Sequence, residues 1–433
     1  MKALAATALA VTSLLSTLGG AAFAGSIDDP HTYNGAASCT QAGCHELTAP
    51  ATDSNVDRNE YAVWSQGPHS KSYLVLLSDQ ANRIARNMGV GTPTQADLCL
   101  DCHTTNAPLD QRGSLYNAEE GVSCESCHGA SGLWFETHSD LDVTIEELRA
   151  QGLRPTHDPI RRAEICLDCH FGASDQFAGH RLLAAGHPRV SFELDSYTEI
   201  NAHHTVDDDY VERKSNVDGV RVWAIGQAMA IERRMSLLAD PRTGTLGFFP
   251  EMAFFDCHSC HAPMSVKRKA SVNKRGQPRF DDAHMKMLSI AMRFAEPGLG
   301  DEIAGDIRRL HAAAAQSRSA VVSAAKQMQS TAQRAVESLA TRSFQGGEMR
   351  EILQVLARDG ASGRYSDYAT AEQTALVIDS TLAALINGAH ISDADYDRLS
   401  GALDQVFSTV ESDDRYSASQ FTSAMRAFQA SLP

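Results

Sequence analysis

The string Gly121-Val-Ser-Cys-Glu-Ser-Cys-His-Gly129 decides how this chain is built. It places two cysteines three positions apart and a histidine directly after the second cysteine. All ten cysteines of the chain follow this order, in the pairs Cys39 and Cys44, Cys99 and Cys102, Cys124 and Cys127, Cys166 and Cys169, and Cys257 and Cys260. The histidines that follow these pairs are His45, His103, His128, His170 and His261. A pattern repeated five times indicates one chemistry repeated five times.

That chemistry is the covalent attachment of haem c, in which two thiols bond to one porphyrin edge and the next histidine binds the iron. A disulfide scaffold would give no reason for a histidine after every second cysteine, and zinc sites need four ligands where each motif offers three. We therefore predict five covalently bound haem c groups, attached through the ten cysteines, with the five motif histidines as proximal ligands. The first motif is longer, C-x-x-x-x-C-H, and a disulfide beside an ordinary histidine stays open for it.

The N-terminus has the form of a secretory signal peptide. Lys2 precedes an apolar run, and Ala22-Phe23-Ala24 is the small-x-small pattern read by signal peptidase. We expect residues 1–24 to be removed before Gly25, with an uncleaved anchor as the alternative. Export would place the chain in the periplasm, our preferred location, or outside the cell, and ten free thiols would not persist in such an oxidising compartment unless they were covalently occupied.

The rest of the sequence limits the partners. The formal net charge is −16, from 38 basic and 54 acidic residues, which argues against nucleic acid and anionic membrane surfaces. No later segment has the ~18 consecutive apolar residues of a membrane span, so we expect no transmembrane segment in the mature chain. A basic redox protein would be attracted by such a charge.

The character of the sequence changes after the last motif. Residues 25–265 hold all five motifs, interrupted by Gly, Pro, Asp and Asn, and read as a pentahaem cytochrome c domain with much irregular structure. Residues 266–299 form a connecting segment, and residues 300–433 read as an all-α helical domain. The predicted fold is therefore mainly α. Apolar stripes at helical spacing support the second domain, and they are Val321, Ala325, Met328, Ala332, Val336 and Leu339; Leu399, Leu403, Val406 and Val410; and Phe421, Met425, Phe428 and Leu432.

Two short sequence patterns predict where helices of the C-terminal domain begin and end. Ser392 stands three residues before Asp395, as in a capping box, and Asn387-Gly388 is typical of a helix stop. Methionines at helical spacing are read as core residues rather than as iron ligands.

Twelve histidines remain as candidates for the second axial position of an iron. The five predicted distal ligands are His69, His138, His180, His187 and His284. If the stretch between them is helical, His180 and His187 share one face about two turns apart and could serve different irons. His31, His157, His203 and His204 are held in reserve, His258 lies inside an attachment loop, and His311 and His390 read as ordinary helix residues.

Residues about 35–175 resemble the tetrahaem cytochrome c-554 family. The resemblance rests on Trp64 followed by His69, and on the string at 121–129 followed by His138. It implies mainly bis-histidine irons in a largely α-helical and irregular fold, with His69 and His138 as distal ligands. It also implies that the second haem can lack a distal ligand, so the iron on His103 is the candidate open site. The longer first motif, the fifth haem and the helical C-terminal domain depart from the family.

Two functions follow as expectations. The first is an electron carrier between a membrane quinol-oxidising cytochrome and a soluble carrier or terminal reductase, with oligomerisation through the C-terminal helices as a further option. The second is an oxidoreductase that acts on a small nitrogen or sulfur compound at one five-coordinate haem. We favour the carrier, because five irons with fixed ligands form a conductor.

Overall fold

A computed structural model describes residues 31–41, 44–46, 59–140, 142–204, 206, 208–214, 217–245, 248–261 and 278–433. Within these residues the chain is helical, and the only β-type pairings are isolated bridges between Tyr33 and Arg112 and between Phe255 and Phe280. The prediction of a mainly α protein with much irregular structure is confirmed. The predicted signal peptide lies outside the described residues, as do two residues of the first attachment loop.

The half of the molecule with the first four motifs is made of short helices and turns. Its helices are α1 (Ala36–Cys39), α2 (Glu60–Gln66), α3 (Asp79–Met88), α4 (Asp97–His103), α5 (Cys124–His128), α6 (Ile145–Ala150), α7 (Pro159–His170), α8 (His180–Ala184), α9 (Leu194–Ile200) and α10 (Asp208–Lys214). Short 3-10 turns occur in both halves of the molecule and cover Leu74–Leu77, Pro93–Gln95, Leu109–Gln111, Ala118–Glu120, Thr243–Thr245, Met252–Phe254, Cys257–Ser259 and Asp413–Arg415. Most of these helices are too short to be stable alone.

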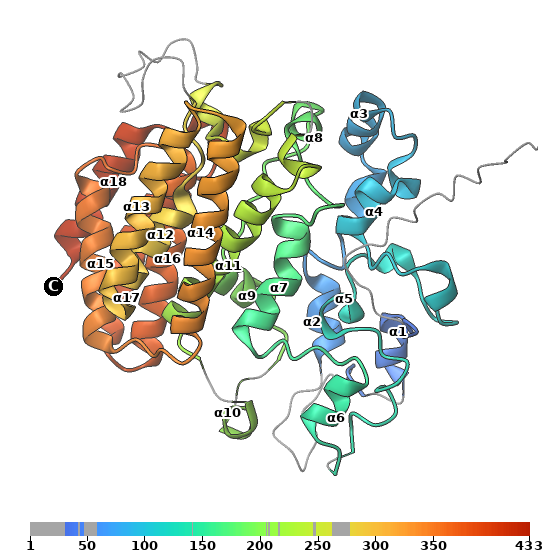
Figure 1. The fold of residues 1–433 in the computed structure, drawn as a ribbon. Helices are drawn as coiled ribbons and strands as arrows, with labels where there is room; N and C mark the ends of the chain where they lie inside the picture. The colour runs from blue at the N-terminus through green and yellow to red at the C-terminus, as the bar shows by residue number, and fades with distance from the viewer. Residues whose placement is uncertain are drawn as a thin grey trace, which may run out of the picture.

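The other half is a bundle of long helices. They are α11 (Gly219–Ala239), α12 (Ala283–Ala295), α13 (Pro297–Ala313), α14 (Arg318–Leu339), α15 (Gly346–Ala361), α16 (Tyr368–Asn387), α17 (Asp393–Phe407) and α18 (Ala418–Ser431). Figure 1 shows α12–α18 gathered on one side, in yellow to red, and α1–α6 on the other, in blue to green. Helices α7 and α11 lie between them and pack against each other.

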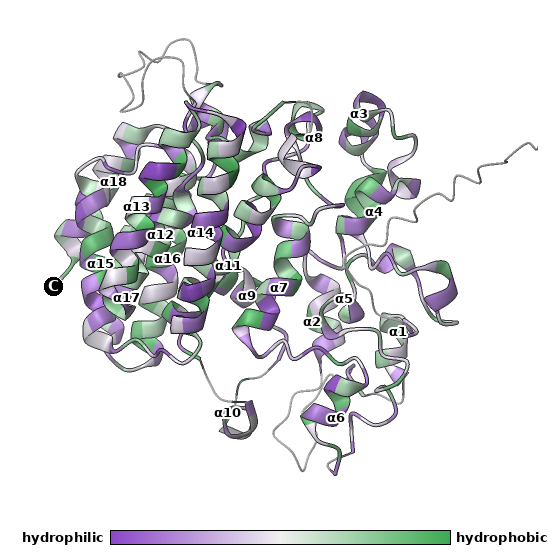
Figure 2. Cartoon of the chain, viewed as in Figure 1, coloured by the Kyte–Doolittle hydropathy of each residue, from purple (hydrophilic) through white to green (hydrophobic). Residues whose placement is uncertain are grey.

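The bundle helices bury the apolar stripes that the sequence shows at helical spacing. Five residues of the stripe on α14 are buried, among them Met328, and the stripe on α18 buries Met425 between two phenylalanines. Figure 2 shows hydrophilic and hydrophobic residues mixed along these helices, as amphipathic packing requires. Ser392 accepts a hydrogen bond from the backbone of Asp395 at the start of α17, and α16 ends at Asn387 with Gly388 as its C-cap.

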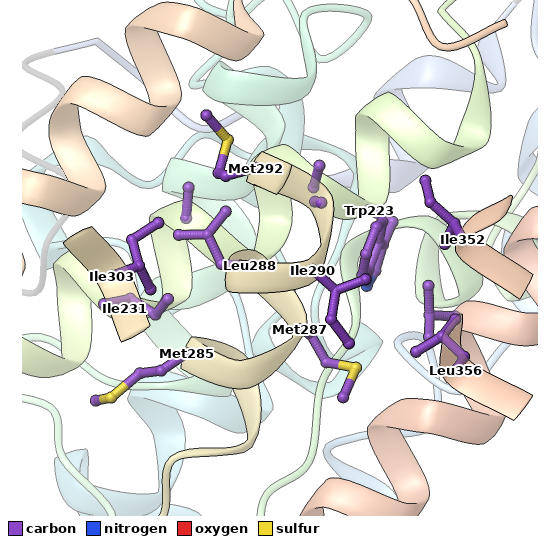
Figure 3. Close-up of a cluster of buried hydrophobic side chains, with 14 of the residues drawn as sticks. Trp223, Ile231, Met285, Met287, Leu288, Ile290, Met292, Ile303, Ile352 and Leu356 are labelled. Carbon is purple, nitrogen blue, oxygen red and sulfur yellow. The ribbon is translucent and has the colours of Figure 1, made fainter. Parts of the chain in front are cut away.

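Helix α11 is the centre of the bundle. Trp223, on α11, is fully buried among Met287 and Ile290 of α12 and Ile352 of α15 (Figure 3). One continuous apolar core extends from Val220 to Phe428, so α11 and α12 share a core with the C-terminal helices. The domain boundaries at residues 265 and 300 stay a prediction. Helix α11, which begins at Gly219, packs in the same core as the C-terminal helices.

The fifth motif sits on the bundle. Its 3-10 turn follows Phe254, which is buried in the bundle core. Nε2 of the His258 ring lies 2.8 Å from Oδ1 of Asp413, which stands between α17 and α18. His258 therefore turns toward the bundle.

Candidate haem-binding site

Three of the five attachment motifs form the last turns of helices. His103 ends α4, His128 ends α5 and His170 ends α7. Residues three and four positions apart share one helix face, so both cysteines and the histidine of a C-x-x-C-H turn point the same way. This is the arrangement that one porphyrin with two thioether bonds and one axial imidazole requires.

Four of the motif histidines each face another histidine from a distant part of the chain. The ring centroids are 6.2 Å apart for His45 and His138, 6.4 Å for His103 and His187, 6.4 Å for His170 and His69, and 6.1 Å for His261 and His180. A metal binds an imidazole nitrogen at about 2.0 Å, so two imidazoles on opposite sides of one ion have centroids roughly 6 Å apart. The separations fit one iron between each pair.

The remaining motif histidine, His128 of the third motif, faces two candidate distal ligands. His203 lies 6.3 Å from it and His204 lies 5.9 Å from it, measured between ring centroids. The ligand nitrogens of the three residues all lie within 4.8 Å of one another. Sequence reasoning held both only in reserve, and the adjacent histidine pair was the one signal for them.

His284, predicted as a distal ligand, is placed elsewhere. Its ring packs against Phe171, and its Nδ1 lies 2.8 Å from Oε1 of Gln227 on α11. Burial lowers the pKa of His284 to about 4, so the ring is a neutral, hydrogen-bonded core residue. The structure brings it to none of the five motif histidines.

Backbone carbonyls orient several of the facing rings. The Nδ1 atoms of four of them lie within hydrogen-bond distance of a carbonyl oxygen: His103 and Ser72 at 2.9 Å, His138 and Phe135 at 2.6 Å, His187 and Pro188 at 2.8 Å, and His203 and Asn201 at 2.7 Å. A proton donated from Nδ1 leaves the Nε2 lone pair for a metal, and the contact fixes the orientation of the ring.

Burial also keeps the rings in the form that binds a metal. It lowers the pKa of His128 to about 3 and of His170 to about 4, and lowers the pKa values of His69 and His103. These imidazoles are therefore neutral near pH 7, and metal binding needs the neutral ring.

The histidine on the first motif has a different partner. Nδ1 of His45 lies 3.1 Å from Oε2 of Glu60, the first residue of α2. The other oxygen of the same carboxylate lies 3.6 Å from Nδ1 of His204. Burial alone raises the pKa of the Glu60 carboxyl, but the contacts with His204 and His45 outweigh burial and hold this pKa well below its usual value.

A cavity of about 2410 Å³ runs between the first four motifs. Its mostly apolar wall includes the cysteines and histidines of all four, together with their facing histidines from the loops at 69, 138, 187 and 203. Apolar bulk must fill such a space in a stable protein, because interiors are close-packed. A smaller cavity of about 90 Å³ lies beside Cys257 and also touches Cys169 and His170. The residues around the first four motifs therefore fit covalently bound porphyrins.

Neighbouring motifs are tied together by side chains. Nε2 of Gln176 donates to the carbonyl of Asp101 at 2.7 Å and approaches Sγ of Cys102 at 2.9 Å and Sγ of Cys169 at 3.4 Å, which joins the second motif to the fourth. The buried carboxylate of Glu125, inside the third motif, accepts from the backbone of Asn34 and Gly35 and so holds the segment before the first motif.

The glycines that bracket the third motif are required by close packing. Gly121 has φ +77°, and a Cβ there would lie 2.5 Å from the carbonyl oxygen of His69. Gly129 has φ +85°, and a Cβ there would clash with the carbonyl of Gly152. The segment 121–129 is thus the point where the loop that carries His69 approaches the third motif.

Helical attachment turns, facing imidazoles and an apolar cavity define the class of c-type cytochromes. Within that class, residues 38–129 match the family described as "Cytochrome c554 and c-prime", a stretch that includes the first three motifs. No curated protein and no solved structure matches the chain. The chain resembles the cytochrome c554 family over this stretch, carries covalently bound haem c and acts in electron transfer.

Proposed function

We propose that this chain is an exported, periplasmic pentahaem cytochrome in which every iron has two histidine ligands. The proximal and distal pairs are His45 with His138, His103 with His187, His128 with His203 or His204, His170 with His69, and His261 with His180. The observation that carries this proposal is the common separation of the paired rings, which suits one metal ion between each pair.

Haem iron with two imidazoles is low-spin and exchanges one electron while its ligands stay in place. The chain contributes the fixed orientation of each ring and the exclusion of water by the apolar cavity wall. Contacts between the motifs support short separations between neighbouring sites: Gln176 joins the second and fourth motifs, and the smaller cavity lies between the fourth and the fifth. These contacts favour a conductor that extends from the motif half toward the bundle.

The same geometry argues against an open iron on His103. The family resemblance implies that the second haem can lack a distal ligand, but His187 faces His103 across 6.4 Å with its ring oriented by a backbone carbonyl. Each of the five motif histidines has a facing imidazole, so the oxidoreductase alternative has no iron that these positions leave open for a substrate.

The redox partners belong to the proposal as classes. We expect a membrane quinol-oxidising cytochrome on one side and a soluble carrier or terminal reductase on the other. None of the described helices combines the length and apolar character needed to cross a bilayer. The acidic balance of the chain favours a partner with a basic docking face.

Electron paramagnetic resonance of the oxidised protein tests this function, together with the intact mass. We expect a mass equal to the mature polypeptide plus five haems, and only low-spin ferric signals that do not change on adding nitrite, nitric oxide or hydroxylamine. A native high-spin signal that these ligands alter would favour the oxidoreductase, and a mass with four haems would remove the first motif from the set.

A further inference from the structure

Glu60 is a largely buried carboxylate beside a proximal histidine, and the proposed electron transfer gives it no role. It begins α2, and its side chain is 16% exposed. One carboxylate oxygen lies 3.1 Å from Nδ1 of His45, and the backbone N–H of the next residue, Tyr61, donates to the His45 carbonyl at 3.0 Å. The start of α2 therefore contacts both the ring and the backbone of the same histidine.

The carboxylate is held from a second side. Its other oxygen lies 3.6 Å from Nδ1 of His204, an ion-pair distance that is longer than a hydrogen bond. Because both oxygens have a histidine neighbour, the carboxylate cannot turn away from His45 without losing the His204 contact. Glu60 thus stands between the first and the third haem sites.

A carboxylate affects an iron ligand differently from a carbonyl. The Nδ1 atoms of His103, His138 and His187 meet backbone carbonyls, which are neutral acceptors. A full negative charge on the N–H side of an imidazole makes the ring a more basic ligand and stabilises the higher charge of ferric iron. An iron so held gains an electron less readily, so its reduction potential falls.

On the basis of the proposed bis-histidine ligation, we propose that Glu60 is a positioning residue that orients His45 and lowers the reduction potential of the first haem. It acts on the iron through His45. The contact with His204 fixes the carboxylate in place. The reduction potential of the first haem is then set by a charged group, whereas the ligands of other haems contact neutral backbone carbonyls.

Glu60→Gln tests this assignment because it keeps the shape of the side chain and removes the charge. In a potentiometric titration followed by visible and paramagnetic resonance spectra, we expect the largest rise in one of the five midpoint potentials, that of the first haem, and the iron to stay low-spin. A tenfold loss of the preference for ferric iron corresponds to a rise of about 59 mV for a one-electron couple. Glu60→Asp, which draws the carboxylate back by one methylene, should give a smaller rise.

Glu46→Gln is the matched control. Glu46 is the neighbour of His45 in sequence and is exposed, so this variant removes the same charge close to the same histidine, where solvent screens it. Equal shifts in Glu60→Gln and Glu46→Gln, or no shift in either, would overturn the proposal, because the effect would then depend on net charge or be absent.

The haem that responds is identified in a His138→Ala background. Removing His138 opens the first iron, so its high-spin signal titrates apart from the low-spin signals of the other four. Adding Glu60→Gln should move the high-spin titration. Among the low-spin titrations only that of the third haem should follow, by a smaller amount, through the longer contact between Glu60 and His204. If the high-spin signal forms but does not move, the inference about Glu60 fails alone. If His138→Ala forms no high-spin signal, the ligand pairing fails, and the inference falls with it.

Discussion

Three of the facing histidines, His138, His187 and His203, are held at two places, by the segment of chain that carries them and by a backbone carbonyl at Nδ1. His187 shows this most simply, since it follows α8 directly and its Nδ1 meets the carbonyl of Pro188, the next residue. The ring is fixed by its own loop and needs no other side chain. Removing such a ring should therefore change the iron and little else.

We predict that His187→Ala converts one haem from low-spin to high-spin and lets it bind carbon monoxide, because the iron on His103 loses its facing imidazole. Visible and paramagnetic resonance spectra measure the change. The matched control is His284→Gln, which alters a buried histidine that faces Phe171 and Gln227. An unchanged spectrum in His187→Ala, or a high-spin haem in His284→Gln, would reverse the assignment.

The local part of this site is the part that a sequence can predict. Attachment motifs are readable because their chemistry lies within five or seven consecutive residues, whereas a distal ligand reaches its iron from far away in sequence. His138 lies 93 positions after His45, and His187 lies 84 after His103. Sequence reasoning therefore proposed His69, His138, His180 and His187 without partners, placed His284 among them, and held His203 and His204 in reserve.

At the scale of elements, the start of α16 is a buried network of charges. Asp367 caps the helix by accepting from the backbone N–H of Thr370 at 2.8 Å, and it pairs with Arg279 at 2.8 Å and Lys286 at 3.3 Å. Burial by itself raises the pKa of Asp367, but Lys286 and Arg279 outweigh burial and lower this pKa to about 2. The network ties α12 and the segment before it to α16.

Asp367→Asn should destabilise the bundle by about 1–3 kcal/mol near pH 7, because Arg279 and Lys286 lose one of their two buried carboxylate partners and keep only Asp282. The folded-state pKa lies below the unfolded value of about 3.9, so the charge stabilises the fold above that value and its contribution is lost as the pH falls toward 2. Urea unfolding at several pH values measures this.

The exposed pair of Glu302 and Arg334 supplies the control, and Glu302→Gln should change the free energy of unfolding by less than about 1 kcal/mol. An Asp367→Asn variant as stable as this control at pH 7, or equally destabilised at pH 7 and near pH 2, would contradict the role of the network.

The sequence predicts those helices of the bundle that have one polar and one apolar face. The stripes on α14, α17 and α18 have the helical period, and the structure buries most of their residues. Helix α11 has no such stripe, because thirteen of its 21 residues are buried on several sides, from Val220 to Leu238. A helix enclosed by others shows no amphipathic period, so only the structure reveals it as the bundle centre.

At the scale of the whole molecule, the two halves are stabilised in different ways. The bundle has a continuous side-chain core, whereas the motif half surrounds a cavity of about 2410 Å³ and has only small buried apolar clusters, such as Tyr33 with Ala107 and Ala130. The porphyrins must supply the missing apolar contacts there.

We therefore predict that a chain made without haem attachment keeps α11–α18 folded and loses the structure of residues 31–204. Hydrogen exchange followed by mass spectrometry should show protection in the bundle and rapid exchange in the motif half. The haem-loaded protein is the control and should be protected in both halves. Comparable protection of residues 31–204 in the two forms would show that the motif half folds on its own side chains.

The central claim is that five irons per chain each lie between two histidines. Near-infrared magnetic circular dichroism of the fully oxidised protein measures this directly, because its charge-transfer band identifies the axial ligand pair and its intensity counts the haems. We predict a single bis-imidazole band with the intensity of five haems per chain. A band of another ligand pair, a high-spin contribution, or an intensity equal to four bis-imidazole haems would contradict the claim.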